Sequence, residues 1–257
     1  LFRRGLPAFQ PVSFAIPEYP MDITGNGALR ILEAIRDFQS EASHKLKFYQ
    51  ASSSEMFGAA PPPQNEKTPF VPQSPYGAAK VFAHNMTNLY REAYGIFAVA
   101  GILFNHESER RGETFVTRKI TRGIARIKAG LDKKLYLGNL NAKRDWGYSP
   151  EFCEAMWLMM QQPKPDDYVI GTGETHTVKE FVELAFKEAG LGNWKKYVEI
   201  DPQYYRPAEV NILVADTRKA KKILGWRPRT KFSNLVKIMV WADINSVNSS
   251  SCSYGQH

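Results

Sequence analysis

A tyrosine and a lysine four residues apart, Tyr76 and Lys80, follow a serine-rich segment that ends in a glutamate, Ser52–Glu55. On a helix, this spacing places the phenol and the ammonium group on one face, one turn apart. A nearby ammonium stabilises a phenolate, so we expect Lys80 to lower the pKa of Tyr76 from its ordinary value of about 10. Tyr76 could then accept a proton from a hydroxyl as hydride leaves the same carbon for a nicotinamide, with the Ser53 hydroxyl holding the substrate oxygen. These residues predict redox chemistry on a sugar alcohol.

Taken alone, the Tyr-x-x-x-Lys spacing is weak evidence, because twelve tyrosines give a lysine at that distance about once by chance. The simpler interpretation is a surface tyrosine and lysine on an ordinary amphipathic helix. Two neighbouring features favour catalysis instead. Ser74 and Pro75 form a good helix start, an N-cap followed by a first-turn proline, and the serines follow a predicted buried strand.

Helical and extended patterns alternate along the chain, which is typical of an α/β protein with a parallel sheet. We expect strands at 46–51, 97–104 and 135–137, and helices near 28–38, 75–94, 114–128, 178–189 and after Asp216. The strand at 97–104 ends at Asn105 and His106, and ligands bind at such strand ends. The segment 143–147 looks like part of a separate cap.

Charge and cysteine usage narrow the class of partner. The formal net charge of +8 over 257 residues favours an anionic partner, either nucleic acid or a phosphate-bearing small molecule. Lysine and arginine are scattered, with only short clusters such as Lys219–Lys222, so we expect solvated helix faces and no nucleic acid. Cys153 and Cys252 give neither a disulfide framework nor a metal site, and a reducing cytoplasm is expected. No apolar run approaches the ~20 residues of a membrane span.

The chain resembles the GDP-mannose 4,6-dehydratases, of the extended short-chain dehydrogenase/reductase class, from about Val12 to Ile244. The resemblance rests on six ordered blocks: FYQASSSEMFG at 48–58, SPYGAAK at 74–80, GILFNHES at 101–108, RRGETFVTRKI at 110–120, RDWG at 144–147 and YRPAE at 205–209. It implies conversion of GDP-mannose to GDP-4-keto-6-deoxymannose, on the route to fucose, with bound NADP reduced and reoxidised within one turnover.

Carried over from the family, the catalytic hydroxyl falls on Ser53, the glutamate on Glu55, the tyrosine on Tyr76 and the lysine on Lys80. Tyr76 would deprotonate the C4 hydroxyl, and Glu55 would remove and later return the C5 proton. The alternative for Glu55 is a solvated carboxylate at a strand end. In the related dTDP-glucose dehydratases an aspartate stands where this chain has Ser54, which favours the GDP-mannose branch.

The resemblance also assigns binding residues. Cofactor contacts would be Tyr76, Lys80, His106 and Arg111, and the Arg110–Arg111 loop would reach the NADP phosphate of a second copy in a dimer or tetramer. Substrate contacts would come from Asn105, Lys119, Arg144, Arg206 and Glu209. The simpler alternatives are a satisfied histidine at a strand end for His106 and surface salt bridges for the arginines.

The chain also departs from the family. A complete member begins with a strand, a Gly-x-x-Gly-x-x-Gly turn and a helix that holds the pyrophosphate, and no three glycines have that spacing. We therefore expect residues 1–104 to be the remaining part of an NADP-binding Rossmann-like domain that lacks its N-terminal strands. Residues 105–244 would be mainly a smaller substrate-binding α/β region with segments returning to the first part, and 245–257 a disordered tail.

Two other functions remain open. One is a truncated, non-catalytic chain that binds a full-length relative, because residues 1–11 and the tail match nothing in the family. The other is a different sugar-nucleotide epimerase or reductase, which Glu55 and the loop 110–114 disfavour.

Overall fold

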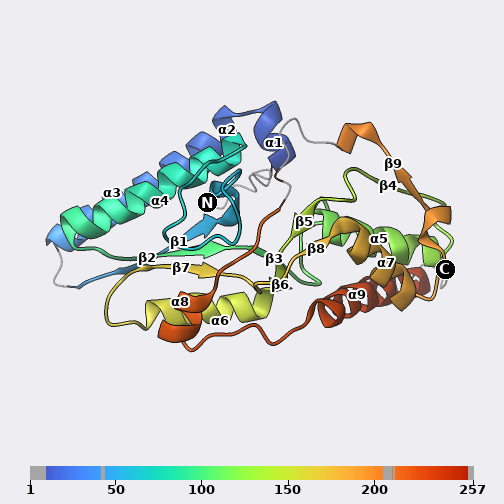
Figure 1. Ribbon diagram of the computed structural model, residues 1–257. Helices are drawn as coiled ribbons and strands as arrows, with labels where there is room; N and C mark the ends of the chain where they lie inside the picture. Colours follow the sequence, from blue (N-terminus) through green and yellow to red (C-terminus); the bar gives the residue numbers. More distant parts are fainter. Residues whose placement is uncertain (1–9, 42–43, 205–209, 211, 254–257) are drawn as a thin grey trace.

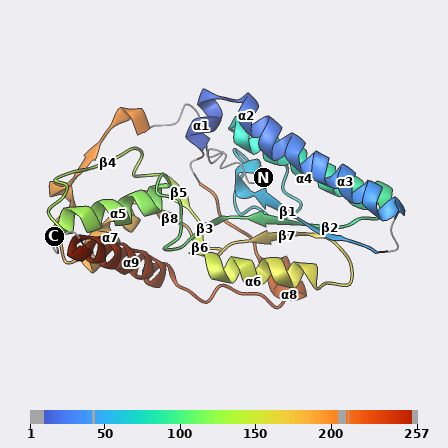
Figure 2. The same ribbon diagram turned by 180° about the vertical axis from the view of Figure 1, so that it is seen from behind.

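The computed structural model describes residues 10–41, 44–204, 210 and 212–253. Figure 1 shows two groups of elements: a sheet with helices on both of its faces, and a helical group beside it that includes α5, α7 and α9. The same arrangement seen from behind confirms that helices α3 and α4 lie on one face of the sheet and α6 and α8 on the other (Figure 2).

The sheet consists of three parallel strands in the order β1-β2-β7. Their bounds are Lys47–Ser53 for β1, Phe97–Leu103 for β2 and Asp167–Ile170 for β7. The central strand β2 consists mainly of small or apolar residues and is almost wholly buried, as expected for a parallel strand covered on both faces. Ser53 of β1 pairs with Leu103 of β2, so the carboxyl ends of both strands meet at one edge.

On one face lie α3, Gly27–Glu41, and α4, Pro75–Tyr94, after the short segments α1 (Gln10–Ala15), α2 (Glu18–Pro20) and η1 (Met21–Asn26). Helix α4 starts as predicted, because the Ser74 side chain accepts from the backbone N–H of Gly77 and Pro75 occupies the first turn. It ends at Gly95, whose positive φ of 63° suits glycine. The other face is covered by α6, Ser149–Met160, and α8, Arg218–Ile223.

The second group has its own apolar core, to which Ile120, Phe181 and Leu235 contribute from three different helices. These helices are α5 (Val116–Lys128), α7 (Val178–Glu188) and α9 (Phe232–Ser253), accompanied by the parallel pair β4 (Leu135–Leu137) and β9 (Val198–Ile200). Helix α7 begins with a capping box between Thr177 and Glu180.

Two short strand pairs connect the groups (Figure 1). Strand β3, Asn105–Glu107, runs parallel to β6, Trp146–Tyr148, and β5, Lys143–Arg144, is antiparallel to β8, His176–Thr177. The 3₁₀ turns are η2 (Ser54–Met56), η3 (Trp194–Lys196) and η4 (Pro202–Tyr204). The pairing of β3 with β6 brings the sequence after β2 next to the Arg-Asp-Trp-Gly segment.

The predicted α/β class with a parallel sheet is confirmed, and the boundary after Phe104 remains a prediction. The expectation of a disordered tail is wrong for residues 245–253, because α9 continues as a helix to Ser253. Ile244 is buried and Val247 packs against the core of the second group, so the helix is anchored beyond the predicted end. Residues 254–257 lie outside the described residues. Among the described helices, none is both long and apolar enough to cross a membrane.

Candidate active site

The end of β1 turns directly into a 3₁₀ turn that carries the glutamate. Ser53 is still extended, with φ −145° and ψ 143°, and is the N-cap of the turn Ser54–Met56. Its Oγ accepts the backbone N–H of Glu55 at 3.2 Å. One serine hydroxyl therefore fixes the backbone from which the Glu55 carboxylate projects.

Helix α4 begins in close contact with this turn, and a glycine permits the contact. A Cβ atom at Gly77 would lie 2.8 Å from the carbonyl oxygen of Glu55 and 3.1 Å from Cβ of Pro72. Because Tyr76 is the neighbour of Gly77, the close approach brings its phenol to the strand end. The Tyr76 phenol and the Ser53 hydroxyl are hydrogen-bonded. The structure thus brings together Ser53, Glu55 and Tyr76.

The surroundings of Tyr76 favour the neutral phenol. Burial is the largest effect and the negative charge of Glu55 adds to it, while the hydrogen bond with Ser53 and the charge of Arg111 act in the opposite direction. Together they raise the pKa of Tyr76 to about 12. The expectation that Lys80 lowers this pKa is wrong for this structure: Lys80 Nζ lies 5.6 Å from the centre of the tyrosine ring and donates to the carbonyl oxygen of Ala51 at 2.7 Å.

Lys80 lies on the same helical face as Tyr76, as predicted, and is a perturbed amine. Burial lowers its pKa to about 8, because a charged ammonium is costly to remove from water. The bond to Ala51 uses one of the three N–H donors of the ammonium. Lys80 therefore links α4 to β1 and retains donors for a ligand at the strand end.

His106 and Arg111 reach the site from the segment that follows β2. The Nδ1–H of His106 donates to the Phe104 carbonyl oxygen at 3.0 Å, and its ring stacks on Phe152 with centroids 5.0 Å apart. Burial and the charge of Arg111 lower the pKa of His106, so a neutral imidazole with Nε2 as an acceptor is favoured.

Arg111 is held by a buried carboxylate. Its Nε lies 3.2 Å from Glu107 Oε2, and its guanidinium covers the ring of Phe115 at 3.6 Å. Glu107 also accepts from the Thr117 hydroxyl at 2.6 Å, and burial raises its pKa against the opposing effects of these two partners. The charge of Arg111 acts on the pKa of Tyr76, which places this arginine near the strand end.

The predicted substrate residues are only partly brought together. Asn105 starts β3 and is paired in register with Trp146, two residues beyond Arg144. Arg144 is 6% exposed and donates to the carbonyl oxygen of Val210 at 2.6 Å. Lys119 projects from α5 with its Nζ 3.2 Å from the centre of the Tyr204 ring. Arg206 and Glu209 lie outside the described residues.

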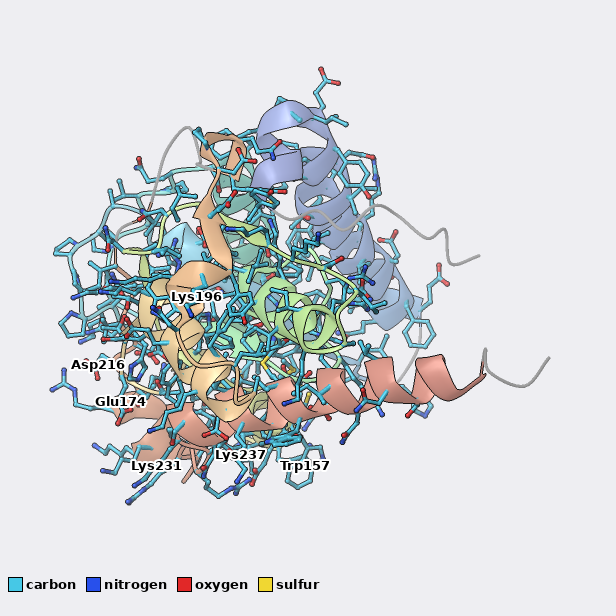
Figure 3. The ribbon with its side chains drawn as sticks, turned by 90° about the vertical axis from the view of Figure 1, so that its right-hand side faces the viewer. Trp157, Glu174, Lys196, Asp216, Lys231 and Lys237 are labelled. Carbon is cyan, nitrogen blue, oxygen red and sulfur yellow. The ribbon has the colours of Figure 1, made fainter. Side chains whose placement is uncertain are left out.

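Asp145 was not singled out from the sequence, although it stands within the Arg-Asp-Trp-Gly block. Its side chain is fully buried and accepts four hydrogen bonds, at 2.7 to 3.2 Å, from Thr172 N, Thr172 Oγ1, Gly173 N and Ala215 N. Burial raises the pKa of Asp145 and these donors oppose the change. Glu174 and Asp216, which follow the two loops, lie on the same side of the molecule in Figure 3. Asp145 therefore joins both loops to the strand segment that contains Arg144.

Known proteins resemble the chain over most of its length. The family model described as GDP-mannose 4,6 dehydratase matches residues 8–239. GDP-mannose 4,6 dehydratase 2 of Arabidopsis thaliana is 60% identical over 91% of this chain and 62% of its own length. The Dictyostelium discoideum GDP-mannose 4,6 dehydratase is 51% identical over 96% of this chain and 74% of its own length.

Solved structures share the fold. The structure of RMD from Pseudomonas aeruginosa complexed with NADPH has a TM-score of 0.82 at 20% identity, covering 94% of this chain and 80% of that one. The UDP-glucose 4-epimerase of Thermotoga maritima with UDP-glucose has a TM-score of 0.81 at 24% identity, covering 95% and 76%. The chain spans slightly less than two thirds of the length of the Arabidopsis relatives it matches.

Proposed function

The chain belongs to the GDP-mannose 4,6-dehydratase family, and on that premise we propose that it removes water from GDP-mannose to give GDP-4-keto-6-deoxymannose, a precursor of fucose and related deoxysugars. The observation that carries this proposal is the meeting of three groups at the end of β1. The Tyr76 phenol is hydrogen-bonded to the Ser53 hydroxyl, and the negative charge of Glu55 raises its pKa. A dehydratase of this kind needs a proton acceptor at one carbon and a carboxylate for the next.

NADP is the proposed cofactor, and when bound it would supply reversible hydride transfer. The residues that would hold it are Lys80, His106 and Arg111, together with Tyr76. Lys80 fits the ribose hydroxyls of the nicotinamide end, since its buried ammonium has donors beyond the one given to Ala51. These residues do not include a glycine-rich turn for the pyrophosphate, because no three glycines in the sequence have Gly-x-x-Gly-x-x-Gly spacing.

In the proposed reaction, Tyr76 accepts the proton of the C4 hydroxyl as C4 is oxidised to a ketone. The ketone makes the C5 proton acidic, and Glu55 removes it. The C6 hydroxyl then leaves with one of these two protons as water, and Glu55 delivers the other to C5 once C6 has been reduced. Two protons are taken and two are returned, so the net change is the loss of water with no net oxidation.

The raised pKa of Tyr76 sets a condition on the first step. With a pKa of about 12, the phenol carries its proton at neutral pH, so Tyr76 must first lose that proton to solvent before it can accept the one from the C4 hydroxyl. Arg111 is the cationic residue whose charge opposes that of Glu55 at the Tyr76 phenol. Ser53 would exchange its hydrogen bond with the phenol for one with the C4 oxygen.

The substrate diphosphate is proposed to meet the cationic residues Lys119, Arg144 and Arg206. Asn105 and Glu209 would complete the set, with Glu209 accepting from the hydroxyls of the nucleotide ribose. Arginine suits a diphosphate because its planar guanidinium forms two parallel hydrogen bonds. The proposal also includes a second copy of the chain, in a dimer or tetramer, reached through the Arg110–Arg111 loop. A cytoplasmic location suits a chain with two cysteines that suggest no disulfide framework.

The proposal is tested with the purified chain in two assays: NADPH binding by cofactor fluorescence, and formation of the 4-keto-6-deoxy product from GDP-mannose. We expect binding with turnover, and we expect Y76F and E55Q each to lose at least ~100-fold in kcat, the usual range for a general acid or base. The matched control is Y136F, because Tyr136 is exposed on β4 and belongs to the second group of elements.

If the unaltered chain binds neither NADPH nor GDP-mannose, the dehydratase proposal is wrong for this polypeptide. Binding without turnover would instead favour the non-catalytic partner of a full-length relative. Product retaining the C6 hydroxyl with an inverted C4 would identify an epimerase.

A further inference from the structure

A chain of polar side chains runs behind the candidate active site, from the residue before Ser53 to the far strand of the sheet. It contains Ser52 on β1, His84, Asn88 and Arg91 on α4, and Asp167 on β7. The proposed reaction uses none of them. Such buried polar groups are costly unless they are paired, so their pairing is informative.

The first link joins the strand end to the helix. Ser52 Oγ lies 2.9 Å from His84 Nδ1, and the two residues are 4% and 3% exposed. The imidazole is also held in orientation by Phe70, whose ring meets it edge-on at 5.1 Å. Ser52 is the immediate neighbour of Ser53, the residue that caps the Glu55 turn and bonds the Tyr76 phenol.

The second link anchors the histidine to β7. His84 Nε2 lies 3.4 Å from Asp167 Oδ2, and the Asn88 amide donates to the same oxygen at 3.0 Å. Arg91 donates to the other oxygen of Asp167 at 2.6 Å and, through Nε, to the Ala98 carbonyl oxygen at the start of β2. All three strands of the sheet are thus tied to the helix that carries Tyr76 and Lys80.

The charge on Asp167 is well supported. Burial opposes its ionisation, but the hydrogen bonds and charges of His84 and Arg91 outweigh burial and lower the pKa of Asp167 to about 2. The arrangement of serine, histidine and carboxylate is nevertheless not that of a nucleophile. Ser52 is 4% exposed and its hydroxyl is paired with His84, so it is not presented at the surface as a nucleophile would be.

We propose that Ser52, His84 and Asp167 form a positioning network that locks the end of β1 against α4 and thereby aligns Ser53 with Tyr76; this rests on the proposed function. The link from Ser52 to His84 is the part that acts on the active site, because it fixes the residue next to Ser53. The link from His84 to Asp167 holds the imidazole in place. His84 acts through the others and touches no substrate.

Two amide substitutions separate the links. In H84N the side-chain amide occupies the position of the imidazole Nδ1 and can still form a hydrogen bond with Ser52. In H84Q the longer side chain places the amide near the position of Nε2, where it can bond Asp167, and Ser52 is left unpaired. The two variants have the same functional group, so they share the loss of the ring. S52A removes the first link by a much smaller change and serves if H84Q does not fold.

The experiment measures kcat and KM for GDP-mannose together with the urea midpoint of unfolding. We expect H84Q and S52A to lose on the order of 10-fold in kcat, with KM within ~2-fold, and H84N to stay within ~3-fold of the unaltered protein. The double variant S52A/H84Q should be no slower than the slower single variant, because both break one link. Equal losses in H84N and H84Q that follow their losses of stability would overturn the proposal.

A second arm does not depend on activity. The Glu55 amide, which donates to Ser53 Oγ, should exchange its hydrogen faster in H84Q and S52A than in H84N and the unaltered protein. If the unaltered chain shows no turnover, the proposed function fails while this difference still supports the network. Equal exchange rates in all four proteins would reject the network whether or not the chain is active.

Discussion

The Glu55 carboxylate and the Tyr76 phenol are electrostatically coupled: the negative charge of the first raises the pKa of the second. They reach this arrangement from different elements, Glu55 from the turn after β1 and Tyr76 from the first turn of α4. The coupling means that the two proposed acid–base groups do not act independently. A proton gained by Glu55 makes Tyr76 easier to ionise, in the order that the proposed reaction requires.

Replacing Glu55 by glutamine should lower the pKa of Tyr76, because the amide has no negative charge. The ionisation of Tyr76 is obtained from the ultraviolet absorbance of tyrosinate during an alkaline titration, as the difference between each protein and its Y76F derivative. E55Q should also fail to exchange the C5 proton of the sugar with solvent deuterium. An unchanged phenol titration in E55Q would show that burial alone sets the pKa.

Lys80 should make the stability of the protein depend on pH above neutrality. Its pKa is about 8 in the folded protein and 10.5 for an ordinary, unperturbed lysine, so the unfolded state binds more protons between these pH values. Burying the ammonium lowers the free energy of unfolding by its maximal amount below about pH 8, and this destabilisation disappears as the pH rises to 10.5. The unaltered protein should therefore gain about 2 kcal/mol relative to K80M between pH 7.5 and 10.5, allowing for partial exposure.

The measurement is the free energy of unfolding in urea for both proteins across this pH range. The matched control is K67M, because Lys67 is exposed in a loop, and its difference from the unaltered protein should stay constant with pH. If the difference in free energy of unfolding between K80M and the unaltered protein also stays constant with pH, the Lys80 ammonium is solvated and not buried.

Replacing Gly77 by alanine should separate α4 from the Glu55 turn. The added Cβ would meet the Glu55 carbonyl oxygen at 2.8 Å, which is backbone and cannot swing aside. We expect a loss of about 1–3 kcal/mol in the free energy of unfolding, together with a fall in kcat.

Gly27→Ala provides the comparison for this substitution, since its Cβ would find its nearest neighbour at 3.7 Å, an ordinary contact. G27A should be neutral or slightly stabilising, as expected for alanine at a helical position. Equal effects of G77A and G27A would argue against a close contact at Gly77.

Replacing Asp145 by asparagine should destabilise the protein strongly. The amide nitrogen that replaces one carboxylate oxygen cannot accept hydrogen bonds, so buried donors from Thr172, Gly173 or Ala215 are left unpaired. We expect a loss of about 2–4 kcal/mol, measured by urea unfolding. D132N should cost under ~1 kcal/mol, because Asp132 forms a surface pair with Arg126. Similar losses in both variants would contradict the structural role of Asp145.

The elements around the site were predictable because their signals are local. Ser74 and Pro75 mark the start of α4, and the apolar run after 46 marks β1, so the sequence locates the strand and the helix beside which Ser53, Glu55 and Tyr76 lie. The effect of Lys80 was not predictable. Its spacing from Tyr76 is a local property, but its hydrogen bond to Ala51 depends on how α4 packs on β1.

The links through His84 and Asp145 were missed for the same reason. His84 meets an aspartate 83 positions away in the sequence, and Asp145 gathers amides from two later loops. Nothing in the spacing of these residues indicates such contacts. The helix beyond Ile244 was missed because its serines and asparagines have low helical propensity, while burial of Ile244 and packing of Val247 extend the helix.

The hydroxyl of Ser53 serves two partners at once, the backbone of the Glu55 turn and the phenol of Tyr76. An alanine at this position would therefore disturb the carboxylate and the tyrosine together. A loss of kcat in that variant could not be assigned to one of the two groups. Threonine keeps the oxygen and is the cleaner substitution. For the same reason, the two limbs of a pH–rate curve for this protein belong to the set of coupled groups and not to single residues.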